Sequence, residues 1–180
     1  MNKIEIYEHP YVDVFKTFKI FDSKMCHKEG DVTESILKNL GKVLKIQGTT
    51  LSSNYIQIPG AKSSTKSLGL TGKEQFLIVK GIEGKQFSFH LEFVINDKNV
   101  IRLSFSNIFK EQKSCSGTSI QIPLALEPVW TILHIQGFNI LHDAGIFSSS
   151  NDKKFFLWSV QMCSNIWIKG IYTSDIAYNV

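Results

Sequence analysis

Long apolar runs are missing from this sequence. No stretch approaches the roughly 20 consecutive apolar residues that span a bilayer, and the charged start, Met1–Glu5, lacks the apolar segment of a secretory signal. The sequence also has no Asn-x-Ser/Thr sequon. We therefore expect a cytoplasmic protein that does not bind or cross a membrane.

Cysteine is scarce, and metal-binding spacings are absent. The three cysteines, Cys26, Cys115 and Cys163, are odd in number and far apart, which is typical of reduced thiols in a cytosolic protein. The five histidines form no His-x-His or His-x-x-x-His pair, and there is no Cys-x-x-Cys. We expect neither a metal nor another cofactor.

A coherent catalytic set is missing as well. Cys115 lies in a segment typical of an exposed thiol loop, residues 113–117, but no base can be assigned to it. His142 and Asp143 are adjacent beside a turn, which favours a surface pair over a catalytic dyad. The Ser-Ser-Thr-Lys-Ser run, residues 63–67, lacks the framing glycines of a phosphate-binding loop. We expect no enzymatic activity.

Acidic residues are absent between Glu34 and Glu74. That interval contains six lysines, although the formal net charge of the whole chain is only +4: Lys38, Lys42, Lys45, Lys62, Lys66 and Lys73. A solvated face with a loop would explain the interval, and so would a contact surface for an acidic partner. The modest total charge argues against nucleic-acid binding.

Strand signals dominate what is present, and the clearest lies at 86–105. Phe87, Phe89, Leu91 and Phe93 fall on alternate residues, which predicts a strand with one buried face. A polar turn at 96–99 leads to a second alternating run, 100–105, so the two form a β-hairpin. A lone hairpin is marginal in water, so more sheet must cover these apolar residues.

Further segments predict more strands and little helix. Seven more strands are predicted, at 43–47, 54–58, 76–79, 118–122, 129–135, 155–161 and 166–172. With the two strands of the hairpin, the total is about nine. Alternating strand and helix signals are absent, so we expect an all-β fold, an antiparallel, jelly-roll-like β-sandwich.

The remaining segments complete this prediction. A helix, turn or strand is predicted at 11–21, one helical turn at 106–113, and a short helix at 138–145. Residues 22–39 and 61–67 are expected to be loops, and residues 1–10 a polar arm. We expect a single domain, 1–180, with one or two short helices.

Two groups of side chains have competing interpretations. His90, Glu92 and Arg102 are expected to be cross-strand neighbours on the polar face of the hairpin. Trp130, Trp158 and Trp167 are most simply core or sheet-edge aromatics, whereas an exposed tryptophan row would indicate a sugar-binding platform.

Five short segments, in this order and spacing, are more specific than a generic β-domain: 53–59, 66–72, 97–107, 129–130 and 169–175. Together they resemble the domain named after cilia- and flagella-associated protein 20, over roughly residues 10–178. The Leu-Gly-Leu-Thr-Gly run (68–72) and the Ser-Asn-Ile-Phe-Lys run (106–110) favour the N-terminal domain of family members that continue into WD repeats. No WD repeat occurs here, so we expect an excised domain or a short paralogue.

The resemblance implies a jelly-roll sandwich with a structural role in cilia and centrioles. It implies a place at the inner junction, where one microtubule wall closes on its neighbour, with tubulin and other inner-junction proteins as partners. It implies no catalytic residues. Because tubulin surfaces are acidic, we expect Lys62, Lys66 and Lys73 to contribute to docking. A lectin-like ligand-binding module is the alternative.

Overall fold

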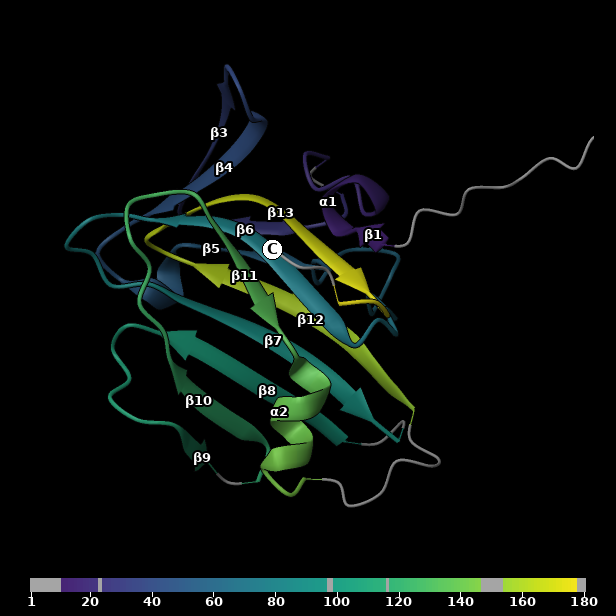
Figure 1. Cartoon of the computed structure of the whole chain (residues 1–180). Helices are drawn as coiled ribbons and strands as arrows, with labels where there is room; N and C mark the ends of the chain where they lie inside the picture. Colours follow the sequence, from purple (N-terminus) through teal and green to yellow (C-terminus); the bar gives the residue numbers. More distant parts are fainter. Residues whose placement is uncertain (1–10, 23, 97–98, 116, 147–153, 178–180) are drawn as a thin grey trace, which may run out of the picture.

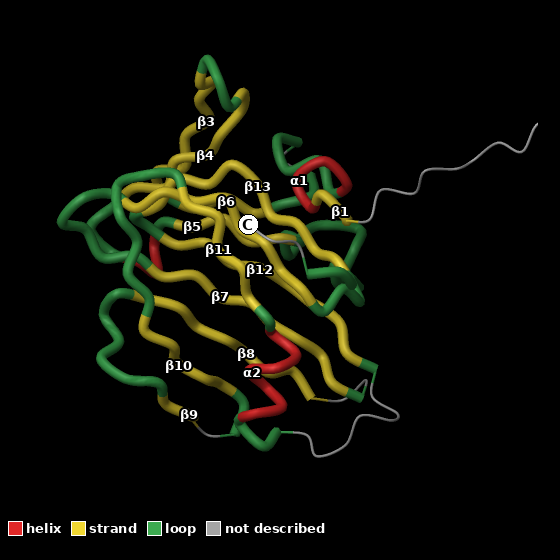
Figure 2. Tube along the Cα trace, viewed as in Figure 1, coloured by secondary structure: helices red, strands yellow, loops and turns green. Residues whose placement is uncertain are grey.

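Two β-sheets make up most of the structure, a computed structural model that describes residues 11–22, 24–96, 99–115, 117–146 and 154–177 (Figures 1 and 2). The expected arm, 1–10, and part of the expected turn at 96–99 lie outside these residues. The all-β sandwich predicted from the sequence is confirmed.

Sheet A contains six strands in the order β11-β6-β13-β4-β3, with β1 also paired to β13. Their bounds are β1 Tyr11–Asp13, β3 Asp31–Leu37, β4 Gly41–Gln47, β6 Glu74–Gly81, β11 Thr131–Ile135 and β13 Ile166–Ser174. All of these pairs are antiparallel. The β3–β4 hairpin extends beyond the body of the sheet (Figure 1).

Sheet B contains seven strands in the order β2-β5-β12-β7-β8-β10-β9. Their bounds are β2 His27–Glu29, β5 Tyr55–Ile58, β7 Ser88–Ile95, β8 Asn99–Ser106, β9 Lys113–Cys115, β10 Ser119–Pro123 and β12 Phe155–Cys163. The consecutive strands β12 and β13 thus lie inside different sheets, joined by a turn at 164–165.

The central hairpin forms as the alternation predicts. Phe89 pairs with Phe105 and Leu91 with Leu103 across β7 and β8. The phenylalanines and leucines of these strands are buried, and they belong to one apolar cluster that includes residues of both sheets. Burial of this shared face is the main force that holds the sheets together.

Two predictions about the strands were wrong. The segment 22–39, expected to be a loop, contains β2 and β3, which helps to raise the number of described strands to thirteen. β3 alternates only weakly, with Val32 and Ile36 on one face and Ile36 exposed, so its pairing with β4 forms a strand that the sequence does not signal clearly. β10 pairs with β8 in parallel, whereas an antiparallel sandwich was expected. A parallel pair needs a connection of about a dozen residues, and the chain between the two strands has this length.

The helical turn expected at 106–113 does not form. The Asn107 side chain instead accepts a hydrogen bond from the Phe87 N–H (3.0 Å) and donates to the Lys85 carbonyl (2.9 Å). These contacts fix the start of the segment against the turn before β7, where the backbone is not free to coil.

Two short α-helices are described, α1 Val14–Thr17 and α2 Gly137–Asp143. The ambiguous segment 11–21 contains both predicted forms, since β1 leads into α1 at Asp13, whose carboxylate accepts the Lys16 N–H (3.1 Å) as a helix cap. Neither described helix has the length and apolar character needed to cross a membrane.

Asn165 connects three turns at one end of the sandwich. Its side chain donates to the Gln86 carbonyl (2.9 Å) and accepts the Gly48 N–H (2.9 Å), and the residue is buried. Asn165→Ala should lower the free energy of unfolding by about 1–3 kcal/mol, because the Gly48 N–H loses its partner. Urea unfolding would measure this. The exposed Asn139→Ala is the control, and an equal loss in both variants would contradict the assignment.

Candidate functional site

The three lysines expected to dock a partner lie on the loop, residues 59–73, that joins β5 to β6. Lys62, Lys66 and Lys73 are all exposed. The middle of the loop is anchored to sheet B, because the Leu68 N–H donates to the Trp158 carbonyl on β12 (2.9 Å). Lys62 and Lys66 precede this anchor and Lys73 follows it.

These lysines have different surroundings. Lys62 lines an open hollow of about 510 Å³, together with Lys24 and His27. Lys73 holds its ammonium group 4.6 Å from the centre of the Phe138 ring on α2. A partner that contacts all three lysines must therefore follow the loop from one sheet to the other.

A second basic feature lies on the outer face of sheet A. Trp167 on β13 pairs with Lys45 on β4 and with Lys80 on β6. The lysine ammonium groups lie 5.2 Å and 6.0 Å from the indole ring centre, respectively. We name these three residues the lysine–tryptophan row. All three are half-buried, whereas their neighbours Ile166 and Ile168 point into the core.

Sequence reasoning missed this row. Lys45 was marked by the acid-free interval, but Lys80 lies beyond Glu74 and Trp167 was assigned to core or sheet edge. The available signal was strand alternation, which sets each of the three on a polar face. The pairing of β13 with both β4 and β6 was needed to bring them together, and local spacing does not encode it.

The outer face of sheet B carries a polar network at its centre. Glu92 binds Arg102 across the hairpin (2.6 Å) and accepts the Ser159 hydroxyl (2.6 Å), so the predicted cross-strand pair is confirmed. His90 Nδ1 lies 2.9 Å from Ser104 Oγ. Burial, followed by the Arg102 charge and against the pull of Glu92, lowers the pKa of His90 to about 4. These groups satisfy one another.

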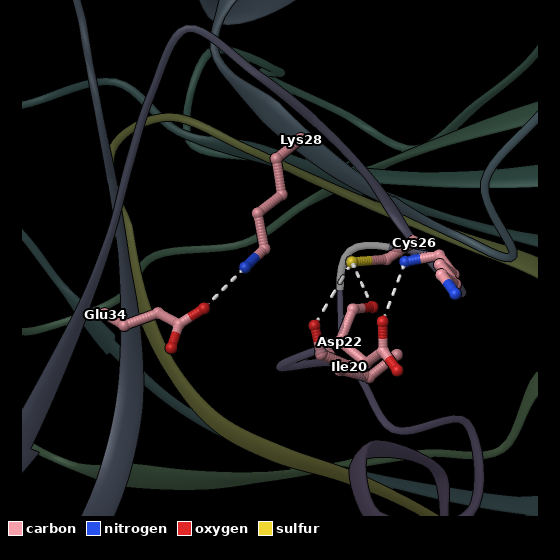
Figure 3. A network of polar contacts seen from close by, with 6 residues as sticks. Ile20, Asp22, Cys26, Lys28 and Glu34 are labelled. Carbon is pink, nitrogen blue, oxygen red and sulfur yellow. Dashed lines mark hydrogen bonds and ion pairs between the residues drawn. The ribbon is translucent and has the colours of Figure 1, made fainter.

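The buried thiols have structural partners. Cys26 Sγ donates to the Ile20 carbonyl at 3.2 Å and lies 4.0 Å from the Asp22 carbonyl (Figure 3). Burial raises the pKa of Cys26, and it also raises the pKa of Cys163, against the opposing effects of Ser88 and Arg102. Both thiols are held protonated, which makes them poor nucleophiles.

Cys115, expected in an exposed loop, is half-buried at the end of β9. His142 and Asp143 form an exposed pair at 3.4 Å, as the sequence indicated. Within the described ranges, no three His, Cys, Asp or Glu residues come together in a way that could hold a metal ion.

The tryptophans do not form one platform. Trp167 lies on sheet A, Trp158 lies at a β-bulge on sheet B, and Trp130 precedes β11. All three are half-buried. An open cleft of about 320 Å³ near β11 is lined mainly by apolar residues such as Ile122, Leu124 and Leu133. Neither feature has the exposed aromatic row expected of a sugar site.

The comparison with protein families gives one match, the CFA20 domain, over residues 2–180. The chain is 35% identical to human WD repeat-containing protein 90 over 190 residues, covering 96% of this chain and 10% of that protein. It is 30% identical to centriole proteome protein 16 of Chlamydomonas reinhardtii, covering 97% of this chain and 8% of that protein. The chain thus spans about a tenth of these relatives.

A shorter relative is covered over most of its length. Cilia- and flagella-associated protein 20 of Paramecium tetraurelia is 26% identical over 165 residues, which is 91% of this chain and 81% of that protein. None of these names is that of an enzyme. The resemblance inferred from the five segments, including the preference for the WD-repeat relatives, is confirmed.

Proposed function

The chain belongs to the CFA20 domain family, and we propose on that premise that it is a structural module which binds microtubules in cilia or centrioles. The observation that carries the proposal is the match over nearly the whole chain to proteins named for centrioles, cilia and flagella. The finer proposal is a role at the inner junction, where the module stabilises the contact between adjacent microtubule walls beside other junction proteins.

The fold is suited to such a role. Strands β12 and β13 each have partners on both sides, and the shared apolar cluster joins the two sheets. A sandwich held together in this way can serve as a rigid spacer between two surfaces. The exposed lysines of the 59–73 loop supply positive charge toward acidic tubulin, which raises the association rate and makes it salt-sensitive.

Charge reversal of the loop lysines tests their role. Lys62→Glu, Lys66→Glu and Lys73→Glu together should reduce co-sedimentation with microtubules by about tenfold at low salt, since three attractive contacts become repulsive. The matched control reverses three other exposed lysines, Lys85, Lys110 and Lys113. Equal pelleting of wild type and the loop variant would remove these lysines from the interface.

A salt series separates the broader proposal from this contact. Pelleting that weakens with salt and with cleavage of the tubulin tails would support docking guided by charge. Pelleting that is indifferent to the tails would place the contact on the lattice wall. If the wild-type chain does not pellet at any salt concentration, alone or on preformed doublets, the microtubule role is wrong. The lectin-like alternative has no specific observation in its favour, because the tryptophans are divided between surfaces.

A further inference from the structure

The lysine–tryptophan row is a preformed arrangement of positive charge. Lys45 and Lys80 approach the same indole from the two strands that flank β13. The strand of each lysine is fixed by core residues on its inner side, such as Leu44 and Val79, both fully buried. Both ammonium groups reach the same ring from the strands on either side of it, so the two charges are held beside one indole.

This charge is not neutralised within the described part of the chain. No described carboxylate forms an ion pair with Lys45 or Lys80. A ring face attracts an ammonium group but leaves its other donor directions open. Lys169, also on β13, adds a third positive charge nearby and donates to the Lys42 carbonyl at 3.3 Å. The row therefore has unused capacity for carboxylates.

Its dimensions fit an extended chain. Neighbouring strands lie about 4.8 Å apart, so the strands that carry Lys45 and Lys80 are separated by about 10 Å. An extended peptide repeats side chains on one side every 7 Å or so, and long glutamate side chains cover the difference. Two carboxylates on such a peptide can bind the two lysines while the segment between them covers the indole.

We propose that the lysine–tryptophan row binds an extended acidic segment of a protein partner, laid across β4, β13 and β6. The inference rests on the proposed function for the identity of that partner, an acidic segment of the microtubule surface. It assigns the contact to the outer face of sheet A, in addition to the 59–73 loop.

The test uses two ligands: a dye-labelled peptide of six glutamates, followed by fluorescence anisotropy, and microtubules, followed by co-sedimentation. The row variant is Lys45→Glu with Lys80→Glu, and the matched control is Lys110→Glu with Lys113→Glu, two exposed lysines outside both basic features, which changes the net charge equally. The row variant should bind the peptide about tenfold more weakly than wild type, and the control less than threefold. A second row variant, Lys45→Gln with Lys80→Gln, guards against misfolding, with thermal unfolding measured for each.

The outcomes of the two binding measurements support or overturn the proposal as follows. Loss of peptide binding in both row variants, with the control nearly unchanged, supports the proposal. Equal losses in the row and control variants would show non-specific attraction and overturn it, as would a wild-type chain that fails to bind the peptide. If wild type binds the peptide through the row but never pellets with microtubules, the acidic-segment site stands and the proposed function fails.

Discussion

Phe89→Ala is expected to lower the free energy of unfolding by about 3–5 kcal/mol. Phe89 is fully buried on β7, and its ring stacks on Phe105 with centres 4.8 Å apart. Met162 of β12 pairs with it on the other side and is also fully buried. Truncation would leave a cavity between three strands that the close-packed core cannot fill, so the transfer and cavity costs add.

Urea unfolding measures this loss as a lower midpoint at an unchanged slope. Phe156→Ala is the matched control, since the same change is made at a half-buried position on β12. Phe156→Ala should lower the free energy of unfolding by about 1 kcal/mol, because Phe156 removes less apolar area from water on folding than Phe89 does. Similar losses at the two positions would mean that Phe89 does not lie in the tightly packed centre.

Stability should fall as the pH is lowered from 6.5 to about 4, because His90 is held neutral in the folded chain. Its pKa is lowered from 6.5 to about 4, first by burial and then by the Arg102 charge. Between these values the unfolded chain binds a proton that the folded chain does not, so acid favours unfolding. The full span amounts to about 3 kcal/mol at most.

His90→Gln should flatten this dependence. Glutamine can still bond Ser104 but does not titrate, so the slope of unfolding free energy against pH should decrease over this interval. His142→Gln, the same change at an exposed position, is the matched control. A slope in His90→Gln equal to that of wild type would show that His90 is protonated equally in both states.

Glu92 contributes at the acidic end. Burial acts to raise its pKa, but hydrogen bonds from Ser159 and Arg102 outweigh this and hold the pKa below its usual range. The stabilisation that Glu92 provides is fully present above the pKa of a glutamate in the unfolded chain. It is lost as the pH falls through the lower pKa that Glu92 has in the folded chain. Some acid sensitivity should therefore remain in His90→Gln.

The strands that the sequence predicted well are those whose own residues carry the signal. Phe87–Phe93 alternates strictly, and the hairpin follows from that pattern and its polar turn. β3 alternates only weakly, and it forms because β4 is adjacent. Asn107 overrides a local helical tendency through contacts twenty or more residues away along the chain. Non-local contacts decided the structure of β3 and of the segment that follows Asn107.

The candidate site shows the same division. Counting charges along the sequence located the lysine-rich loop, because an interval without acidic residues can be recognised from the sequence alone. The lysine–tryptophan row joins residues of three strands that are distant in sequence, so only the sheet order reveals it. The family was identified from the five segments, and this identification did not depend on the lysine–tryptophan row.

The placement of β12 and β13 has a consequence for biosynthesis. Without them, sheet B separates into β2-β5 and β7-β8-β10-β9, and sheet A into β11-β6 and β4-β3. A chain is synthesised from its N-terminus, so neither sheet can assemble all of its strands until the ribosome has translated β12 and β13. Until then the earlier strands carry open edges and apolar faces that attract other chains. The unfinished chain is therefore expected to be most prone to aggregation before β12 and β13 have been translated.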